Sequence, residues 1–85
     1  MGEIMKADGF DDAVVGVTDG SFDSHRRLVY DIDKCIDILV SRDGMTYEEA
    51  MEFFEFNVSG AHVGEGTPIY INKMSLKDLE DSDII

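Results

Sequence analysis

The chain has 85 residues, 44% of them hydrophobic, which is enough apolar material for one folded domain spanning residues 1–85. Its net charge of −12 excludes binding to nucleic-acid phosphates or anionic membranes, which requires clustered lysine and arginine. No stretch approaches the ~20 apolar residues of a membrane span, and the acidic start lacks the pattern of a signal peptide. With one cysteine and therefore no internal disulfide, the chain is expected to be cytoplasmic.

The first third of the chain predicts two strands. Residues 1–12 contain glycines and few apolar side chains, so we expect a loose leader. Residues 13–18 are rich in β-branched side chains and predict a strand, with Gly16 as a candidate for a bulge. After a polar turn, residues 27–30 predict a second strand. The two strands either form a hairpin with a long connection or lie apart in the sheet.

A first amphipathic helix follows the second strand. Asp31 is suited to the N-cap, and apolar residues recur at i, i+3, i+4, i+7 and i+8 from Ile32 to Val40. Gly44 is suited to the left-handed position just after the last turn. This spacing predicts a helix that buries one face and ends before Gly44.

A second helix begins almost at once. Thr46 and Glu49 have the spacing of a capping box, and Gly60 is expected to end the helix. Because the link between the helices is so short, they are expected to form an αα-hairpin. The apolar arc expected to face the core consists of Tyr47, Ala50, Met51, Phe53, Phe54 and Val58.

The last part of the chain adds one strand and an acidic tail. Residues 61–66 are a glycine-rich turn, and residues 67–71 predict a strand with Pro68 at its start or at a sheet edge. A helical turn is expected over residues 75–79, inside the acidic tail of residues 73–85. The element order is β-β-α-α-β. It predicts an α+β domain in which a small sheet of about three strands packs on the αα-hairpin.

Six short motifs lie along the chain: GFDDA at 9–13, YDIDKC at 30–35, RDGMTYEEA at 42–50, FEFNV at 54–58, GAHVG at 60–64 and TP at 67–68. With these motifs, about two thirds of the chain resembles a group of short proteins encoded by bacteriophages. The resemblance does not extend to residues 19–26 or to the tail after Asn72. No established activity accompanies the group, but it implies a phage or prophage origin. By analogy with other small acidic phage proteins, it suggests an inhibitor of host machinery such as an anti-CRISPR protein or a DNA mimic.

The residues that bind metals or catalyse reactions do not form a familiar pattern. Residues 19–30 begin like a calcium-binding loop, but Ser24 stands where that loop needs glycine and Tyr30 where it needs glutamate. No pair among the two histidines and the cysteine has the spacing of zinc ligands. We therefore expect no metal, no cofactor and no enzymatic activity. The histidines and the cysteine are His25, His62 and Cys35.

The turn from Gly60 to Gly66 is a candidate ligand-binding segment. It is rich in glycine, yet no Lys-Ser/Thr pair follows and the next element is a strand, so it lacks the features of a phosphate-binding loop. A ligand-binding protein or small enzyme built around this turn remains an alternative.

The second helix carries the candidate binding surface. Stepping 100° per residue places Phe56 among glutamates, away from the core arc. An aromatic side chain ringed by acids suits a basic, partly apolar partner, unless the leader, the tail or the last strand covers Phe56. The predicted surface consists of Glu48, Glu49, Glu52, Glu55 and Phe56, with a second patch at Asp33 and Asp37.

The sequence predicts a binding module that modulates a basic, nucleic-acid-binding host protein, with no direct contact to nucleic acid or membrane. The alternative is a homodimer whose contact includes Phe56 and residues 69–71. A separate alternative is that the acidity of the chain serves only solubility.

Overall fold

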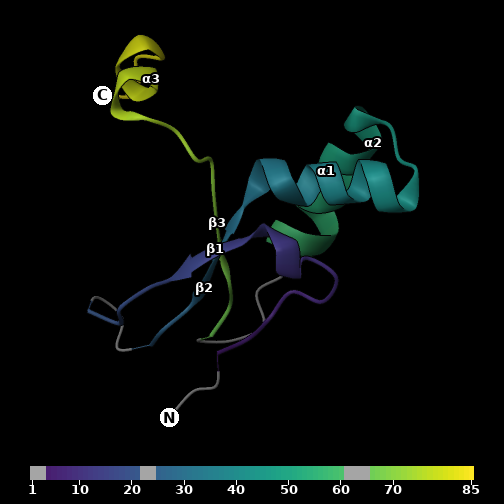
Figure 1. The fold of residues 1–85 in the computed structure, drawn as a ribbon, viewed down its shortest axis with the longest axis horizontal. Coiled ribbons are helices and arrows are strands. Elements are labelled where there is room, and N and C mark those ends of the chain that lie inside the picture. Colours follow the sequence, from purple (N-terminus) through teal and green to yellow (C-terminus); the bar gives the residue numbers. More distant parts are fainter. Residues whose placement is uncertain (1–3, 22–24, 61–65) are drawn as a thin grey trace.

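The computed structural model describes residues 4–21, 25–60 and 66–85. It confirms the α+β class and the predicted order of strands and helices, and adds a 3₁₀ turn and a π-helical turn (Figure 1). The elements are η1 (Asp11–Ala13), β1 (Val14–Val17), β2 (Leu28–Asp31), α1 (Ile32–Asp43), α2 (Tyr47–Phe54), the π-helical η2 (Glu55–Ser59), β3 (Ile69–Ile71) and α3 (Leu76–Asp81).

The sheet has the strand order β1-β2-β3. β1 and β2 are antiparallel neighbours, as the hairpin alternative predicts, and their register shifts between Val14 and Gly16, where a bulge was expected. β3 pairs with β2 in parallel, with Tyr30 opposite Tyr70. Parallel neighbours need a long crossover connection, and the chain between β2 and β3 includes α1, α2 and η2. Pro68 directly precedes the edge strand β3, where no ladder hydrogen bond is lost.

The predicted capping residues lie at both ends of α1 and at the start of α2. Asp31 accepts a hydrogen bond from the Asp33 amide at 3.0 Å, and Gly44 takes the left-handed conformation with φ 70°. Thr46 and Glu49 form the capping box, with N···O distances of 2.9 and 3.1 Å. These contacts satisfy amides that the first helical turns leave without partners inside the helix.

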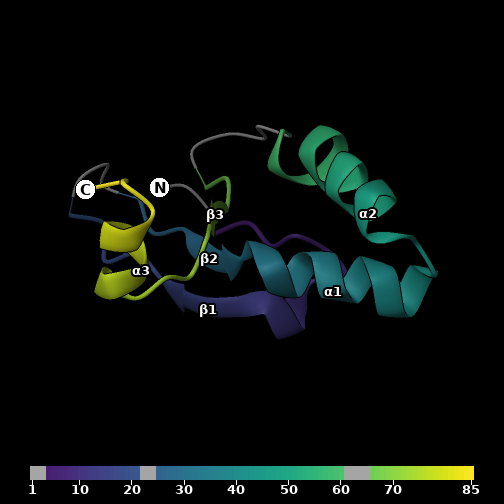
Figure 2. The same ribbon diagram turned by 90° about the horizontal axis from the view of Figure 1, so that it is seen from above.

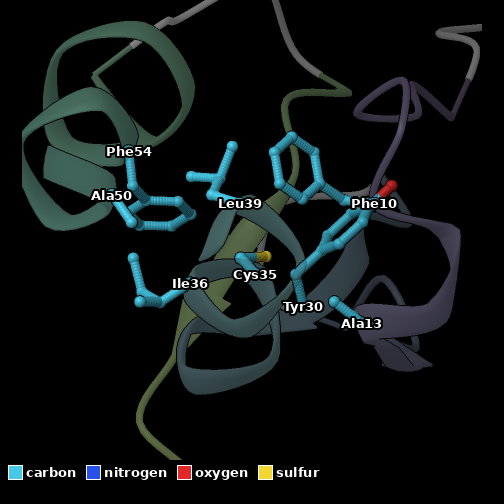
Figure 3. Packing of buried hydrophobic residues seen from close by; sticks show 8 residues of the cluster. All are labelled: Phe10, Ala13, Tyr30, Cys35, Ile36, Leu39, Ala50 and Phe54. Carbon is cyan, nitrogen blue, oxygen red and sulfur yellow. The ribbon is translucent and has the colours of Figure 1, made fainter. Parts of the chain in front are cut away.

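The core lies where the sheet, α1, α2 and η1 meet (Figure 3). Tyr30 is fully buried, and its ring lies 5.5 Å from that of Tyr70. The Tyr70 ring is in turn 5.2 Å from Phe54 in an edge-to-face arrangement. The buried apolar residues are Phe10, Ala13, Tyr30, Cys35, Ile36, Leu39, Ala50 and Phe54.

The predicted apolar arcs are too broad. Tyr47 is 63% exposed and Phe53 38% exposed, although both were expected in the core. Val40 is also exposed, whereas Ile38 packs against the core cluster. Since each helix is covered from one side only, a narrow stripe of its residues becomes buried.

The expectation of a loose leader is wrong for residues 7–12. Phe10 is buried, and the Ala7 amide donates a 2.8 Å hydrogen bond to the Tyr30 hydroxyl. Arg42 donates to the Gly9 carbonyl at 2.7 Å, and its guanidinium lies 5.5 Å from the centre of the Phe10 ring. One aromatic anchor and two long-range hydrogen bonds thus hold a segment without any helical or strand periodicity.

The C-terminal part of the chain contains the predicted helical turn, extended to the six residues of α3. Figures 1 and 2 show α3 standing away from the other helices beyond an extended segment that follows β3. Among the described residues, no helix is long and apolar enough to cross a membrane.

The Tyr30 hydroxyl offers a direct test of how the leader is held. Tyr30→Phe keeps the ring but leaves the part-buried Ala7 amide without its acceptor, so we expect a loss of about 1–3 kcal/mol in the free energy of unfolding. Tyr70→Phe is the matched control, because no described residue hydrogen-bonds to the Tyr70 hydroxyl. Urea unfolding measures the stability of both variants, and equal losses would contradict the claim that the Tyr30 hydroxyl holds the leader.

Candidate functional site

The glutamates of α2 and η2 are exposed and carry uncompensated charge. Within residues 4–21, 25–60 and 66–85, no ion pair involves Glu48, Glu52 or Glu55. The ion pairs found there use acids of other segments, and they are Lys6–Asp11 at 3.3 Å, Arg42–Asp43 at 2.9 Å and Lys77–Asp81 at 3.9 Å. The cations among the described residues therefore leave this face negative.

Phe56 is the most exposed aromatic residue of this face, at 76%. The alternative in which the leader, the tail or β3 covers this ring is therefore wrong. An exposed phenylalanine costs hydration free energy, which makes it a candidate anchor for a partner.

Phe56 and Phe53 border a shallow hollow of about 390 Å³. Met45 lines it together with the two rings, and Glu49 and Glu52 supply carboxylates. Asn57 completes the lining, and its side-chain amide donates to the Phe53 carbonyl at 3.3 Å. The hollow thus offers an apolar surface with negative charge beside it.

The predicted acidic stripe does not form one site: Glu48 is exposed and lines neither of two hollows that the other glutamates border. Glu52 lines the hollow of Phe56, whereas Glu55 lines another one together with Met51 and Tyr70. Glu55 also begins the π-helical turn, in which the Gly60 amide donates to the Glu55 carbonyl at 3.1 Å. Turns of this kind recur at functional sites.

The second predicted patch does not join the hollow. Asp33 and Asp37 are exposed on α1, and neither lines the hollow of Phe56. Asp33 lies in the first turn of α1, where its negative charge interacts favourably with the positive end of the helix dipole.

Glu49 has a structural role beside its place in the hollow. Its carboxylate accepts a hydrogen bond from the Thr46 amide at 2.9 Å, and this bond lowers the pKa of Glu49 below its ordinary value. One of its carboxylate oxygens therefore already accepts a hydrogen bond in the helix cap.

The other candidate groups offer less. Cys35 is fully buried, and burial, followed by the nearby Asp31 charge, raises its thiol pKa to about 11, so the group stays protonated and inert. No cluster of three metal-ligating side chains occurs within the described ranges. Most of the Gly60–Gly66 turn, including His62, lies outside the described residues, as do positions 22–24 of the calcium-like loop.

Three residues of the hollow were not predicted as site residues: Met45, Phe53 and Asn57. The pair Phe53-Phe54 held a usable signal, because adjacent helical residues point about 100° apart. A helix covered from one side cannot bury both rings deeply.

In comparisons with known proteins, no family model, curated protein or solved structure matches the chain. The resemblance to phage proteins therefore stays a prediction.

The π-helical turn can be tested at Gly60. A Cβ atom at this position would lie 2.6 Å from the Glu55 carbonyl oxygen, so Gly60→Ala must displace backbone next to Phe56. We expect a loss of about 1–3 kcal/mol in unfolding free energy. Gly16→Ala is the control, because its Cβ would meet no atom within 4 Å. Urea unfolding that gave equal losses for both variants would refute the requirement for glycine at position 60.

The cap role of Glu49 predicts a pH dependence. Its folded pKa lies below the ordinary 4.5, so its stabilisation is present above the unfolded pKa and is lost as the pH falls through the lower folded value. The stability difference between wild type and Glu49→Gln should therefore be largest near neutral pH and shrink in acid. Urea unfolding across pH measures it, with Glu48→Gln as the control. A difference that persists unchanged in acid would argue against this role.

Proposed function

We propose that this protein is a non-catalytic acidic module that binds a basic surface of another protein. One observation carries the proposal: Phe56 is exposed beside Glu52, in a hollow whose acids have no cation from the described chain. A partner that places an apolar or arginine side chain in the hollow would cover Phe56 and gain contact with the carboxylate.

The charge of the whole chain supports the same choice of partner. A net charge of −12 attracts basic surfaces over several ångströms and raises the rate of encounter more than the final affinity. Salt screens this attraction, so binding is expected to weaken as ionic strength rises.

The partner class we favour is a nucleic-acid-binding protein of the host cell. Such proteins hold phosphates in grooves rich in lysine and arginine, where carboxylates can take the place of phosphates. With the resemblance to phage proteins, this makes the module an inhibitor of the anti-CRISPR or DNA-mimic type, acting in the host cytoplasm.

A matched set of charge reversals tests the surface. Glu48→Lys with Glu52→Lys changes the charge of α2, while Asp8→Lys with Asp12→Lys makes the same change of net charge at exposed positions of the leader. Phe56→Ala removes the ring and should alter stability by less than about 0.5 kcal/mol, because the ring is mostly exposed. Glu49 is left intact to preserve the helix cap.

The readout is capture of a basic protein from host lysate, followed by competition with duplex DNA. We expect the α2 reversal and Phe56→Ala each to weaken capture at least about tenfold, the control reversal to weaken it far less, and DNA to displace the module. Equal losses for both reversals would mean that only bulk charge matters. Full retention by Phe56→Ala would remove the proposed anchor.

A further inference from the structure

The sheet has a second apolar face that no described helix covers. Side chains alternate along a strand, so Tyr30 and Tyr70, which face the helices, have neighbours that point the other way. These neighbours are Val29, Ile69 and Ile71, which lie side by side in the register of β2 and β3. They are partly buried and do not belong to the core cluster. We call them the outer sheet face.

The last helix, α3, is capped at both ends. At its start, the Ser75 hydroxyl accepts a hydrogen bond from the Asp78 amide at 3.1 Å. At its end, the Ile84 amide donates to the Leu79 carbonyl at 3.1 Å, and Asp83 takes a left-handed conformation with φ 58°. This is the Schellman arrangement, which brings the apolar residue after the turn next to the last turn of the helix.

Despite these caps, α3 has little to pack against. Of its six residues only Leu79 is partly buried, while Leu76 is 64% exposed. Beyond the helix, Ile84 and Ile85 are 61% and 69% exposed. A helix of this length is unstable alone in water, so its capped form and apolar side require a packing partner. Both ribbon views show α3 away from the helical hairpin (Figures 1 and 2).

We propose that the occupant of the outer sheet face is α3 of a second copy of this chain. Each copy then donates one helix and receives one, so a two-fold dimer covers both unpartnered surfaces of both chains. The extended segment that joins β3 to α3 carries the helix away from its own sheet, which is the geometry of an exchanged element.

Local charge is compatible with this contact. Lys73 follows β3 and lies next to the outer sheet face in sequence, whereas α3 and the residues after it are mainly acidic. Glu80 of one copy can therefore approach Lys73 of the other, while Leu76 and Leu79 supply the apolar contact.

The dimer and the proposed binding function respond to salt in opposite ways. Two chains of charge −12 repel each other, and salt screens that repulsion, so the dimer should strengthen as ionic strength rises. Binding of a basic partner to α2 should weaken under the same conditions. Because α3 and the hollow of Phe56 share no residues, either proposal can fail while the other stands.

Sedimentation of the full chain over a concentration series, at low and high salt, tests self-association. We expect a monomer–dimer equilibrium that tightens with salt, and a dimer dissociation constant raised at least about tenfold by Leu76→Asp. Asp83→Gly is the control, since glycine favours the left-handed conformation at this position and should preserve the dimer. A monomer at all concentrations, or a dimer unaffected by Leu76→Asp, would overturn the proposal.

A disulfide experiment tests the contact itself. Leu79→Cys and Ile69→Cys are made in separate chains and mixed under mild oxidation, and the pair Leu79→Cys with Phe56→Cys serves as the control. We expect a covalent heterodimer mainly from the first mixture. Failure of that product to exceed the control would overturn the contact. A rapid disulfide within one chain that carries both Leu79→Cys and Ile69→Cys, without covalent dimer, would show that α3 closes on its own sheet instead.

Discussion

The buried Tyr30 side chain joins the parts on which the rest of the molecule depends. Its hydroxyl holds the leader through the Ala7 amide, and its ring packs on Tyr70 of the neighbouring strand. Tyr70 in turn contacts Phe54 of α2. Because Phe54 fixes which side of α2 faces the core, the opposite side, with Glu52 and Phe56, faces water. The candidate binding surface is thus a consequence of how the core is packed.

The features that could be predicted from sequence are those that depend on near neighbours. The caps at Asp31, Gly44 and Thr46 each involve groups a few residues apart, so composition and spacing were sufficient to locate them. The helical hairpin follows from the same local signals. Exposure of Glu52 and Phe56 was predictable as well, because both lie opposite the buried Ala50 and Phe54 on the helical wheel.

The remaining features depend on contacts between distant segments. Burial of Phe10 needs Arg42 and Tyr30, which no periodicity in the leader reveals. The parallel pairing of β3 with β2 depends on the crossover through α1, α2 and η2, and the exposure of Phe53 depends on which side of α2 packs against the core. For the same reason Glu55 lies in a separate hollow, and the acids of α1 do not join the site.

Within the part of the chain that the structure describes, two surfaces of different chemistry lack a covering element, an acidic one on α2 and an apolar one on the sheet. The exposure of the acidic surface on α2 is measured most directly by hydroxyl-radical footprinting of the dilute protein with mass spectrometry. Oxidation of each phenylalanine ring reports its access to water. With Phe56 76% exposed and Phe54 3% exposed, Phe56 should be oxidised many times faster. Similar rates for the two rings would contradict an open binding surface on α2.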